Sequence, residues 1–208
     1  MEVVIDCLRG AAIGAYLPSL AALRIEVFRE YPYLYAGTLE YEAEYLRDYA
    51  RQPQSLVVLA RAGGQVVGAA TAMPLIAYPT DLSTAFEIAG LEPETVFYFG
   101  ESVLQAEFRG RGIGHAFFDA REAAAAGAGF SMTAFCAVER PANHPLCPAG
   151  YRPLDEFWSA RGYVRQPQLR VEYSWRDANE SAESPKPMVF WTRRLKTTLA
   201  SGRGSPAA

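Results

Sequence analysis

The segment from Leu104 to Ala116 restricts the fold more than any other part of the chain. It reads Leu-Gln-Ala-Glu-Phe-Arg-Gly-Arg-Gly-Ile-Gly-His-Ala, so an apolar run passes through a turn rich in glycine into helical spacing. Glycine lets the backbone approach a ligand closely and expose its N–H groups. The first N–H groups of a helix lack internal partners and lie at the positive end of its dipole. The segment therefore predicts a strand, a turn and a helix whose start binds an anionic group such as a diphosphate.

Apolar periodicity on both sides of this segment predicts an α/β class with a mixed, mostly antiparallel central sheet and flanking helices. The expected strands are 3–8, 55–61, 65–73, 95–106, 130–138, 169–175 and 187–193. The expected helices are 15–30, 38–49, 112–126 and 153–161, with a short one over 81–90. Without the short helix the order is β-α-α-β-β-β-α-β-α-β-β. The run 95–106 is largely apolar on both faces, so we expect it at the centre of the sheet.

Length and composition are those of one domain with a sizeable core. The chain has 208 residues, of which half are hydrophobic. We expect a single domain over 1–194 and a disordered tail over 195–208, where glycine and proline gather. The formal net charge of −3 does not indicate a nucleic-acid partner. Three cysteines at irregular spacing and two histidines do not suggest a metal site.

The first residues do not look like a targeting segment. Acidic residues stand at positions 2 and 6, where a signal peptide needs a basic region followed by an apolar run. We also expect no apolar stretch of the ~18–20 residues that would span a bilayer. The expectation is a cytoplasmic protein with no membrane partner.

Other uses of the glycine turn fit less well. In a dinucleotide fingerprint, GxGxxG, the third glycine would replace His115, but here it comes one residue early, at Gly114. The acidic residue that the fingerprint requires about 20 residues further on is missing, because 130–138 runs apolar. A Walker loop would need a Gly-Lys-Ser/Thr sequence, which the turn lacks. A tight turn that binds nothing remains the plainer alternative.

The turn resembles the diphosphate motif of the GNAT superfamily of acyl-CoA-dependent N-acyltransferases, Q/R-x-x-G-x-G/A. The match is complete over Arg109-Gly110-Arg111-Gly112-Ile113-Gly114. The element order is similar from 3 to 193, and 157–163 stands where the family often has a helix that ends in Tyr-x-x-x-Gly-Phe. The resemblance implies a GNAT-like fold, acetyl-CoA as the acyl-donor cosubstrate, and transfer of the acetyl group to a primary amine of a small molecule or peptide. A homodimer, as in many relatives, is compatible with the strands of 169–193.

The resemblance also implies a set of cofactor-binding residues. Arg109 adds positive charge, and backbone N–H groups would hold the diphosphate at Gly110, Arg111, Gly112, Ile113, Gly114 and His115. Ser102, Val103 and Leu104 would pair with the pantetheine arm like an added strand. Asn143 is similar to a family asparagine that contacts the cofactor.

Amine acylation also needs a base, and an acid for the leaving thiolate helps. Glu101 is the candidate base, with a structural glutamate paired to an arginine as the equal alternative. The helix tyrosine that often acts as the acid in the family is replaced by Trp158, which has no acidic proton. Tyr163 and Tyr151 are possible substitutes, and a mechanism without a dedicated acid is the other possibility. The replacement keeps open the alternative of a non-catalytic acyl-CoA-binding module.

Tyrosines and glutamates gather between residues 30 and 49, where the resemblance places the wall of the acceptor site. Aromatic rings and carboxylates together suit a cationic amine. The plainer alternative is a solvated glutamate face with half-buried tyrosines at its edge. Glu139 and Arg140, at the end of the strand 130–138, are further candidates for the acceptor side.

Overall fold

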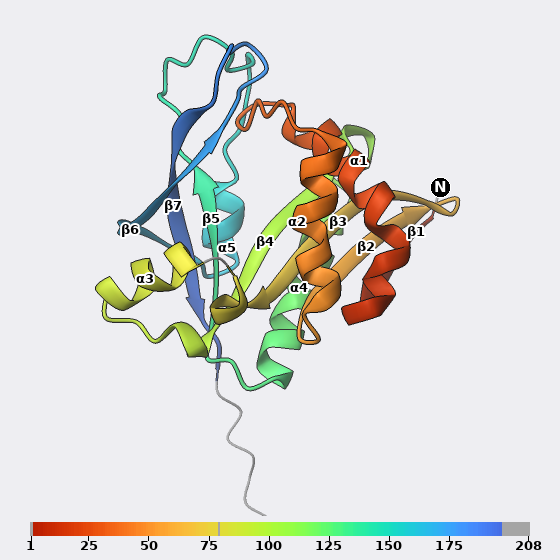
Figure 1. Cartoon of the computed structure of the whole chain (residues 1–208), viewed down its shortest axis with the longest axis vertical. Coiled ribbons are helices and arrows are strands. Elements are labelled where there is room, and N and C mark those ends of the chain that lie inside the picture. The colour runs from red at the N-terminus through yellow and green to blue at the C-terminus, as the bar shows by residue number, and fades with distance from the viewer. Residues whose placement is uncertain (1, 79, 197–208) are drawn as a thin grey trace, which may run out of the picture.

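The protein contains one seven-stranded sheet with the strand order β1-β2-β3-β4-β5-β7-β6 (Figure 1). The computed structural model describes residues 2–78 and 80–196. The strands are β1 (Val3–Leu8), β2 (Leu56–Ala62), β3 (Gln65–Pro74), β4 (Val96–Leu104), β5 (Met132–Val138), β6 (Val164–Trp175) and β7 (Ser184–Arg194). Neighbouring strands are antiparallel, except that β4 and β5 are parallel. The predicted mixed, mostly antiparallel sheet with β4 at its centre is confirmed.

Helices cover both faces of the sheet. The α-helices are α1 (Leu17–Phe28), α2 (Leu39–Arg51), α3 (Thr80–Ile88), α4 (Ile113–Gly127) and α5 (Asp155–Ala160). Short 3-10 helices are η1 (Gly10–Tyr16), η2 (Leu75–Ala77), η3 (Pro93–Thr95) and η4 (Ala106–Phe108). In Figure 1, α1 and α2 lie in front of the sheet and α4 lies behind it. The predicted order of elements is confirmed, with α3 as the expected short helix between β3 and β4.

The last two strands are longer than predicted. β6 begins at Val164 rather than at 169, and β7 begins at Ser184 rather than at 187. Pro167 and Pro185 interrupt the alternation, because proline cannot donate to a strand ladder. The structure tolerates Pro167 because β6 is an outer strand, and its register with β7 shifts there. Pro185 precedes Met188, where the pairing of β7 with β5 begins, so its missing donor breaks no bond to β5.

The expected tail begins just after β7. Residues 195 and 196 have no regular structure, and the rest of the predicted disordered tail lies outside the described residues.

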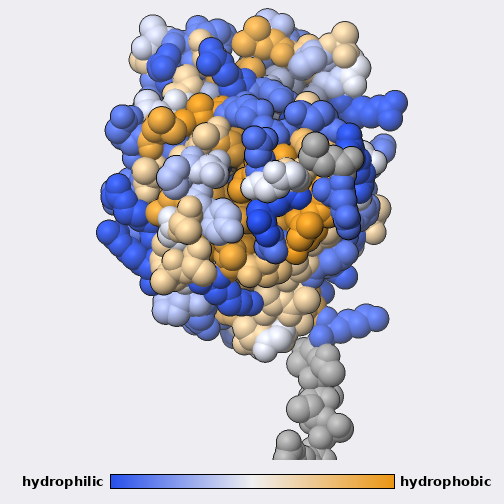
Figure 2. Space-filling view, turned by 90° about the vertical axis from the view of Figure 1, so that its right-hand side faces the viewer, coloured by the Kyte–Doolittle hydropathy of each residue, from blue (hydrophilic) through white to orange (hydrophobic). Residues whose placement is uncertain are grey.

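The N-terminal helical segment corrects the expectation that no apolar stretch is long enough to span a bilayer. Among the described residues, Gly10–Phe28 has the length and composition of a membrane span, with 19 residues. Arg24 lies within it and forms buried ion pairs, and α1 packs against β3 and β4. Figure 2 views the molecule from the side of β1 and α1 and shows hydrophobic residues interspersed with hydrophilic ones. One such segment is weak evidence for a span, because a core helix meets the same criteria.

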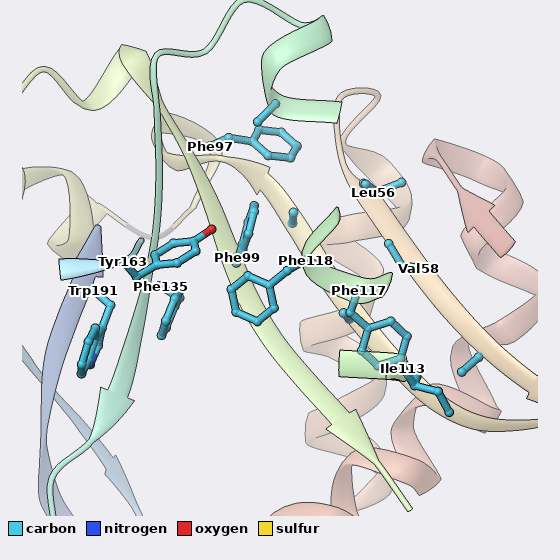
Figure 3. Close-up of a cluster of buried hydrophobic side chains, with 14 of the residues drawn as sticks. Leu56, Val58, Phe97, Phe99, Ile113, Phe117, Phe118, Phe135, Tyr163 and Trp191 are labelled. Carbon is cyan, nitrogen blue, oxygen red and sulfur yellow. The ribbon is translucent and has the colours of Figure 1, made fainter. Parts of the chain in front are cut away.

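The core has a layer on each face of the sheet. Behind the sheet, aromatic side chains of β4 and β5 pack on α4, where the ring of Phe118 contacts those of Phe99, Phe135 and Tyr163 (Figure 3). In front, α1 and α2 cover β2 and β3, and α3 covers β4, β5 and β7. The burial of these apolar faces holds the helices to the sheet.

The central strands separate soon after they pair. The pairing of β4 with β5 runs from Val96↔Met132 to Tyr98↔Ala134 and goes no further in the described residues. Beyond Tyr98, β4 continues to Leu104 while β5 stays paired with β7. A register shift between Ala70 and Ala72 marks a bulge on the other side of β4. Backbone groups of β4 near the bulge thus face the gap between the two strands.

We expect Gly100→Ala to lower the free energy of unfolding by about 1–3 kcal/mol, because the added methyl would overpack the bulge. Its Cβ would overlap the Tyr49 hydroxyl and lie 2.6 Å from Oγ1 of Thr71. Gly127→Ala is the matched control, because a Cβ at the end of α4 meets no described atom within 4 Å. Urea denaturation of both variants tests this. A Gly100→Ala protein as stable as Gly127→Ala would contradict the tight packing at the bulge.

Candidate active site

A buried network of three charges joins α1, α2 and β4 in front of the bulge. The guanidinium of Arg24 donates from Nε to Glu42 and lies 2.7 Å, through Nη1, from Oε1 of Glu101. All three side chains are at least nine-tenths buried. Burial opposes the charge of Arg24, but Glu101 and the other negative neighbours outweigh burial and raise its pKa well above the usual range. The alternative of a glutamate paired with an arginine is therefore observed for Glu101.

Tyrosine hydroxyls surround the other oxygen of Glu101. The Tyr45 hydroxyl donates to Oε2 of Glu101 at 2.9 Å and lies 2.7 Å from the Tyr78 hydroxyl and 3.1 Å from that of Tyr49. Burial above all raises the pKa of Tyr45, Tyr49 and Tyr78 above the ordinary value. These hydroxyls therefore stay protonated at neutral pH. Tyr45 thus holds the Glu101 carboxylate, and Tyr49 and Tyr78 contact the Tyr45 hydroxyl, without any of the three taking a charge.

A cavity of about 160 Å³ opens in front of Glu101. One wall comes from α1, α2 and their connection, with Phe28, Tyr33, Tyr35, Tyr41 and Tyr45. The opposite wall comes from the sheet, with Tyr98, Gly100, Cys136, Tyr173, Trp175 and Met188. Aromatic residues predicted between 30 and 49 thus do face a cavity, although Tyr49 itself is buried behind it.

The connection between α1 and α2 is fastened to the end of β6, which closes one side of this cavity. The N–H of Ala36 donates to the carbonyl of Arg176 at 3.0 Å, and that of Ala178 donates to Leu34 at 2.6 Å. Nε1 of Trp175 donates to the carbonyl of Tyr33 at 3.0 Å. Backbone hydrogen bonds between distant segments thus fix the cavity wall.

Arg140, proposed for the acceptor side, supports the same connection. It donates from Nε to the carbonyl of Pro32 and from Nη2 to that of Tyr33, at 2.7 and 2.8 Å. Its other partner is Asp177. Glu139, the companion candidate, pairs with Arg165 and Arg170 on β6. Both residues therefore brace the wall and are not among the residues that line the cavity.

The glycine turn at the start of α4 forms as the sequence predicted. Gly112 directly precedes Ile113, the first residue of α4, and Gly110 and Gly112 have φ of +73° and +79°. Such angles favour glycine. In the described part of the chain, a Cβ built at either position would meet no atom within 4 Å. The turn thus presents open backbone at the positive end of the helix dipole.

Arginines flank this turn. Arg109 donates from Nε to the carbonyl of Leu104 at 3.0 Å, and its Nη1 lies 2.8 Å from Glu30. The guanidinium of Arg111 lies 5.2 Å from the ring centre of Phe108. Glu30 thus offsets the charge of Arg109, and Arg111 adds positive charge beside the turn.

The other residues predicted to bind the cofactor lie on β4, at the start of α4 and in the connection after β5. Ser102, Val103 and Leu104 lie on β4 past its last pair with β5. His115 is in the first turn of α4, and its Nδ1 lies 3.0 Å from Nη1 of Arg161. Asn143 is exposed in the connection between β5 and α5.

The two tyrosines proposed as acids do not meet Glu101. Tyr163 is 2% exposed in the core behind the sheet, where its hydroxyl lies 2.9 Å from Oγ1 of Thr133 and donates to Glu122 (Figure 3). Tyr151 lies in the connection between β5 and α5, with its ring 4.7 Å from that of Tyr31. Neither residue lines the cavity, and the side chain of Glu101 instead contacts Tyr45 and Arg24. Tyr163 is therefore an aromatic residue of the core.

Sequence analysis missed Arg121 of α4, which supports the bulge from behind. Its Nη1 donates to the carbonyls of Thr71 and Glu101 at 3.2 and 3.1 Å, and its Nη2 donates to Oγ of Ser102 at 2.8 Å. Burial lowers the pKa of Arg121 to about 10, so it remains charged at neutral pH. An arginine between the apolar residues Phe118 and Ala125 was the available signal.

Arg24 and Tyr78 were also missed. Arg24 follows Leu20 by four residues and so shares the core face of α1, which is an unusual position for a charge. Tyr78 follows η2 in a stretch that had no periodicity to place it. Within the described residues, no group of three His, Cys, Asp or Glu side chains is arranged to hold a metal ion.

Comparisons with known proteins point to one family. The model of the acetyltransferase (GNAT) family matches residues 20–149. No curated protein matches the sequence.

The fold is similar to that of several solved structures. For ribosomal-protein-alanine N-acetyltransferase from Brucella melitensis the TM-score is 0.61 at 16% identity, covering 92% of this chain and 99% of that one. For yncA from Salmonella typhimurium, solved with acetyl-CoA, the TM-score is 0.59 at 10% identity, covering 100% and 99%. For an aminoglycoside 6'-N-acetyltransferase complexed with coenzyme A, the values are 0.58 and 16%, covering 92% and 96%. At these identities the likeness shows a shared fold.

We expect Arg24→Leu to lower the free energy of unfolding by about 3–5 kcal/mol, because two buried carboxylates lose their common partner. Arg47→Leu is the control, since Arg47 forms an exposed pair with Glu44 on α2 and such pairs contribute about 0–1 kcal/mol. Urea denaturation at pH 7 measures both. Equal stability of the two variants would show that the Arg24 network does not hold α1 and α2 to β4.

Proposed function

The chain belongs to the GNAT acetyltransferase family, and we propose that it transfers an acetyl group from acetyl-CoA to a primary amine. The observation that carries this proposal is the arrangement along β4. The strand brings Glu101 to a cavity, leaves its edge open from Phe99 to Leu104, and leads into the glycine turn of α4. A donor site and an acceptor site thus meet at one strand.

The residues present suit an acyl-CoA. The open space around Gly110 and Gly112 lets phosphate oxygens approach the backbone N–H groups, and Arg111 adds positive charge. The backbone of Ser102, Val103 and Leu104 is available for the pantetheine arm in the manner of an added strand. When bound, acetyl-CoA supplies an activated thioester carbonyl.

Glu101 is the group best placed to accept the proton that the amine loses. As the bond between the amine nitrogen and the acetyl carbon forms, the bond between that carbon and sulfur breaks. The nitrogen must lose a proton, and Glu101 accepts it directly or through a water. Arg24 and Tyr45 fix the carboxylate in place for this step. Arg121, behind the strand, holds the backbone carbonyl of the same residue.

We propose that the leaving thiolate needs no dedicated protein acid. Trp158 is half-buried and packs against Phe135 and Trp191 at the edge of the core, so the position of the family's helix tyrosine holds a side chain with no acidic proton here. A thiol has a pKa of about 8.5 and is therefore a good leaving group near neutral pH. Solvent can protonate it after release.

The first prediction of this proposal concerns the cofactor. Acetyl-CoA at about 100 times its dissociation constant should stabilise the protein by about 2.7 kcal/mol, measured as a rise in Tm, while NAD should have no effect. An absence of stabilisation by acetyl-CoA would mean that the turn serves only structure or another anion.

Substitution at Gly112 tests whether the diphosphate of acetyl-CoA binds at the glycine turn. Both Gly112→Asn and Gly112→Asp tolerate a positive φ, but only aspartate adds a negative charge at the start of α4. We expect the affinity for acetyl-CoA to be at least about tenfold lower in Gly112→Asp than in Gly112→Asn, because charges a few ångströms apart repel by about 1–4 kcal/mol. Equal affinities would place the diphosphate elsewhere.

The second prediction concerns catalysis. Glu101→Gln should lower kcat by about a hundredfold or more, since it removes the base, and should leave stabilisation by acetyl-CoA unchanged. Glu42→Gln is the matched control, because Glu42 shares Arg24 but is absent from the cavity wall. Release of the CoA thiol with an amine panel measures both variants. An equal loss in the two would assign Glu101 a structural role, and cofactor binding without any turnover in the native protein would favour a non-catalytic acyl-CoA-binding module.

A further inference from the structure

The cavity in front of Glu101 is lined mainly by rings. Nine of its fifteen lining residues are tyrosine, phenylalanine or tryptophan. They come from parts of the chain far apart in sequence, including Tyr41 of α2, Tyr98 of β4 and Trp175 of β6. The tyrosines noted between residues 30 and 49 of the sequence supply only part of this lining. Such a lining favours a flat apolar occupant, because ring pairs gain about 0.5–1.5 kcal/mol beyond their buried area.

The polar groups of the wall are largely engaged with one another. The Tyr45 hydroxyl is bound to Glu101 and Tyr78, and that of Tyr98 lies 3.1 Å from Sγ of Cys136. Nε1 of Trp175 is bound to a backbone carbonyl. A polyhydroxylated amine would have to displace these contacts to satisfy its own hydroxyls, and each hydroxyl left unpaired would cost about 1–3 kcal/mol. An aromatic ring has no such requirement.

The charges at the cavity suit one positive group and no more. Glu101 and Arg24 line the wall, and Glu42 lies behind Arg24, so the network carries a net charge of −1 from two carboxylates and one guanidinium. Arg24 already lies 5.0 and 4.4 Å from the ring centres of Phe28 and Tyr45. A second or third ammonium group of a polyamine would meet this guanidinium instead of a free carboxylate.

The size of the cavity sets a further limit. Its volume of about 160 Å³ is small beside the roughly 300–1,000 Å³ of sites for drug-sized ligands. An apolar cavity of about 150 Å³ is large enough for a benzene ring. Tyr41 is 62% exposed and Ser174 is also exposed, so these two residues mark the mouth.

We propose that the acceptor is a small arylalkylamine, a primary amine joined by a short carbon chain to an aromatic ring. The ring lies among the aromatic side chains, and the nitrogen lies at Glu101. This inference rests on the proposed acetyl transfer and names its acceptor class. The transfer itself is unchanged: the C–N bond forms, the C–S bond breaks, and Glu101 passes the amine proton to solvent.

The test compares amines that differ in the ring. The native protein is assayed for CoA thiol release from acetyl-CoA with 2-phenylethylamine, butylamine, spermidine, kanamycin and a lysine peptide. We expect kcat/KM to be about ten- to a hundredfold higher for 2-phenylethylamine than for butylamine, from burial of the ring. A kcat/KM for any of the four other amines that equals or exceeds that of 2-phenylethylamine overturns the inference.

Variants at the mouth of the cavity test whether the preference for 2-phenylethylamine comes from binding of its ring in this cavity. Tyr41→Ala should raise KM for 2-phenylethylamine about two- to tenfold with little change in kcat, and Tyr41→Phe should keep the native KM. Leu39→Ala is the control, because Leu39 is exposed on the same helix and does not line the cavity. Equal effects of Tyr41→Ala and Leu39→Ala would overturn the assignment of the ring to this cavity.

Calorimetry separates this inference from the proposed function. Titration of the native protein with 2-phenylethylamine should show saturable binding that Tyr41→Ala weakens. Binding of the amine without stabilisation by acetyl-CoA would overturn acetyl transfer and support the aromatic-amine site. Stabilisation by acetyl-CoA with neither binding nor turnover of 2-phenylethylamine would support the cofactor site and overturn the aromatic-amine site.

Discussion

β4 separates from β5 after three residue pairs, and this separation opens the gap beside Glu101. A parallel pair that stayed together to Leu104 would satisfy its own backbone and leave no place for a ligand between the strands. Here β5 remains paired with β7, and β4 remains paired with β3. The gap is therefore held open by two intact ladders, and it does not depend on a flexible loop. Both the aromatic cavity and the path toward the glycine turn begin at this gap.

Two buried arginines hold the bulge of β4 from opposite faces. In front, Arg24 binds the side chain of Glu101, and behind, Arg121 binds the backbone carbonyl of the same residue. The first cation has carboxylate partners, whereas the second has carbonyl and hydroxyl partners, and burial lowers the pKa of Arg121 to about 10. A residue fixed by side chain and backbone together loses little further freedom when it acts. Such preorganisation is what a catalytic carboxylate in the proposed reaction requires.

The sequence predicted what depends on local pattern and could not predict what depends on distant contacts. The glycine turn, the helix predicted over 38–49 and the order of the elements along the chain follow from spacing and were confirmed. The pairing of Arg24 with Glu101 joins residues far apart in sequence, so one sequence gives no means to choose it over other ion pairs. Tyr163 was proposed as an acid because it is near Trp158 in the chain, yet the sheet separates its hydroxyl from the cavity. Closeness in sequence across the end of a helix does not decide which face of a sheet a side chain reaches.

The replacement of the helix tyrosine by Trp158 is consistent with the electrostatics of the whole site. The ring of Trp158 contacts those of Phe135 and Trp191, and none of these three side chains has an acidic proton to give. The charged and hydroxyl groups gather instead around Glu101, where the proton is released. In the proposed reaction the polar groups of the protein therefore serve to deprotonate the amine. The thiolate is a weaker base than the amine, and solvent protonates it.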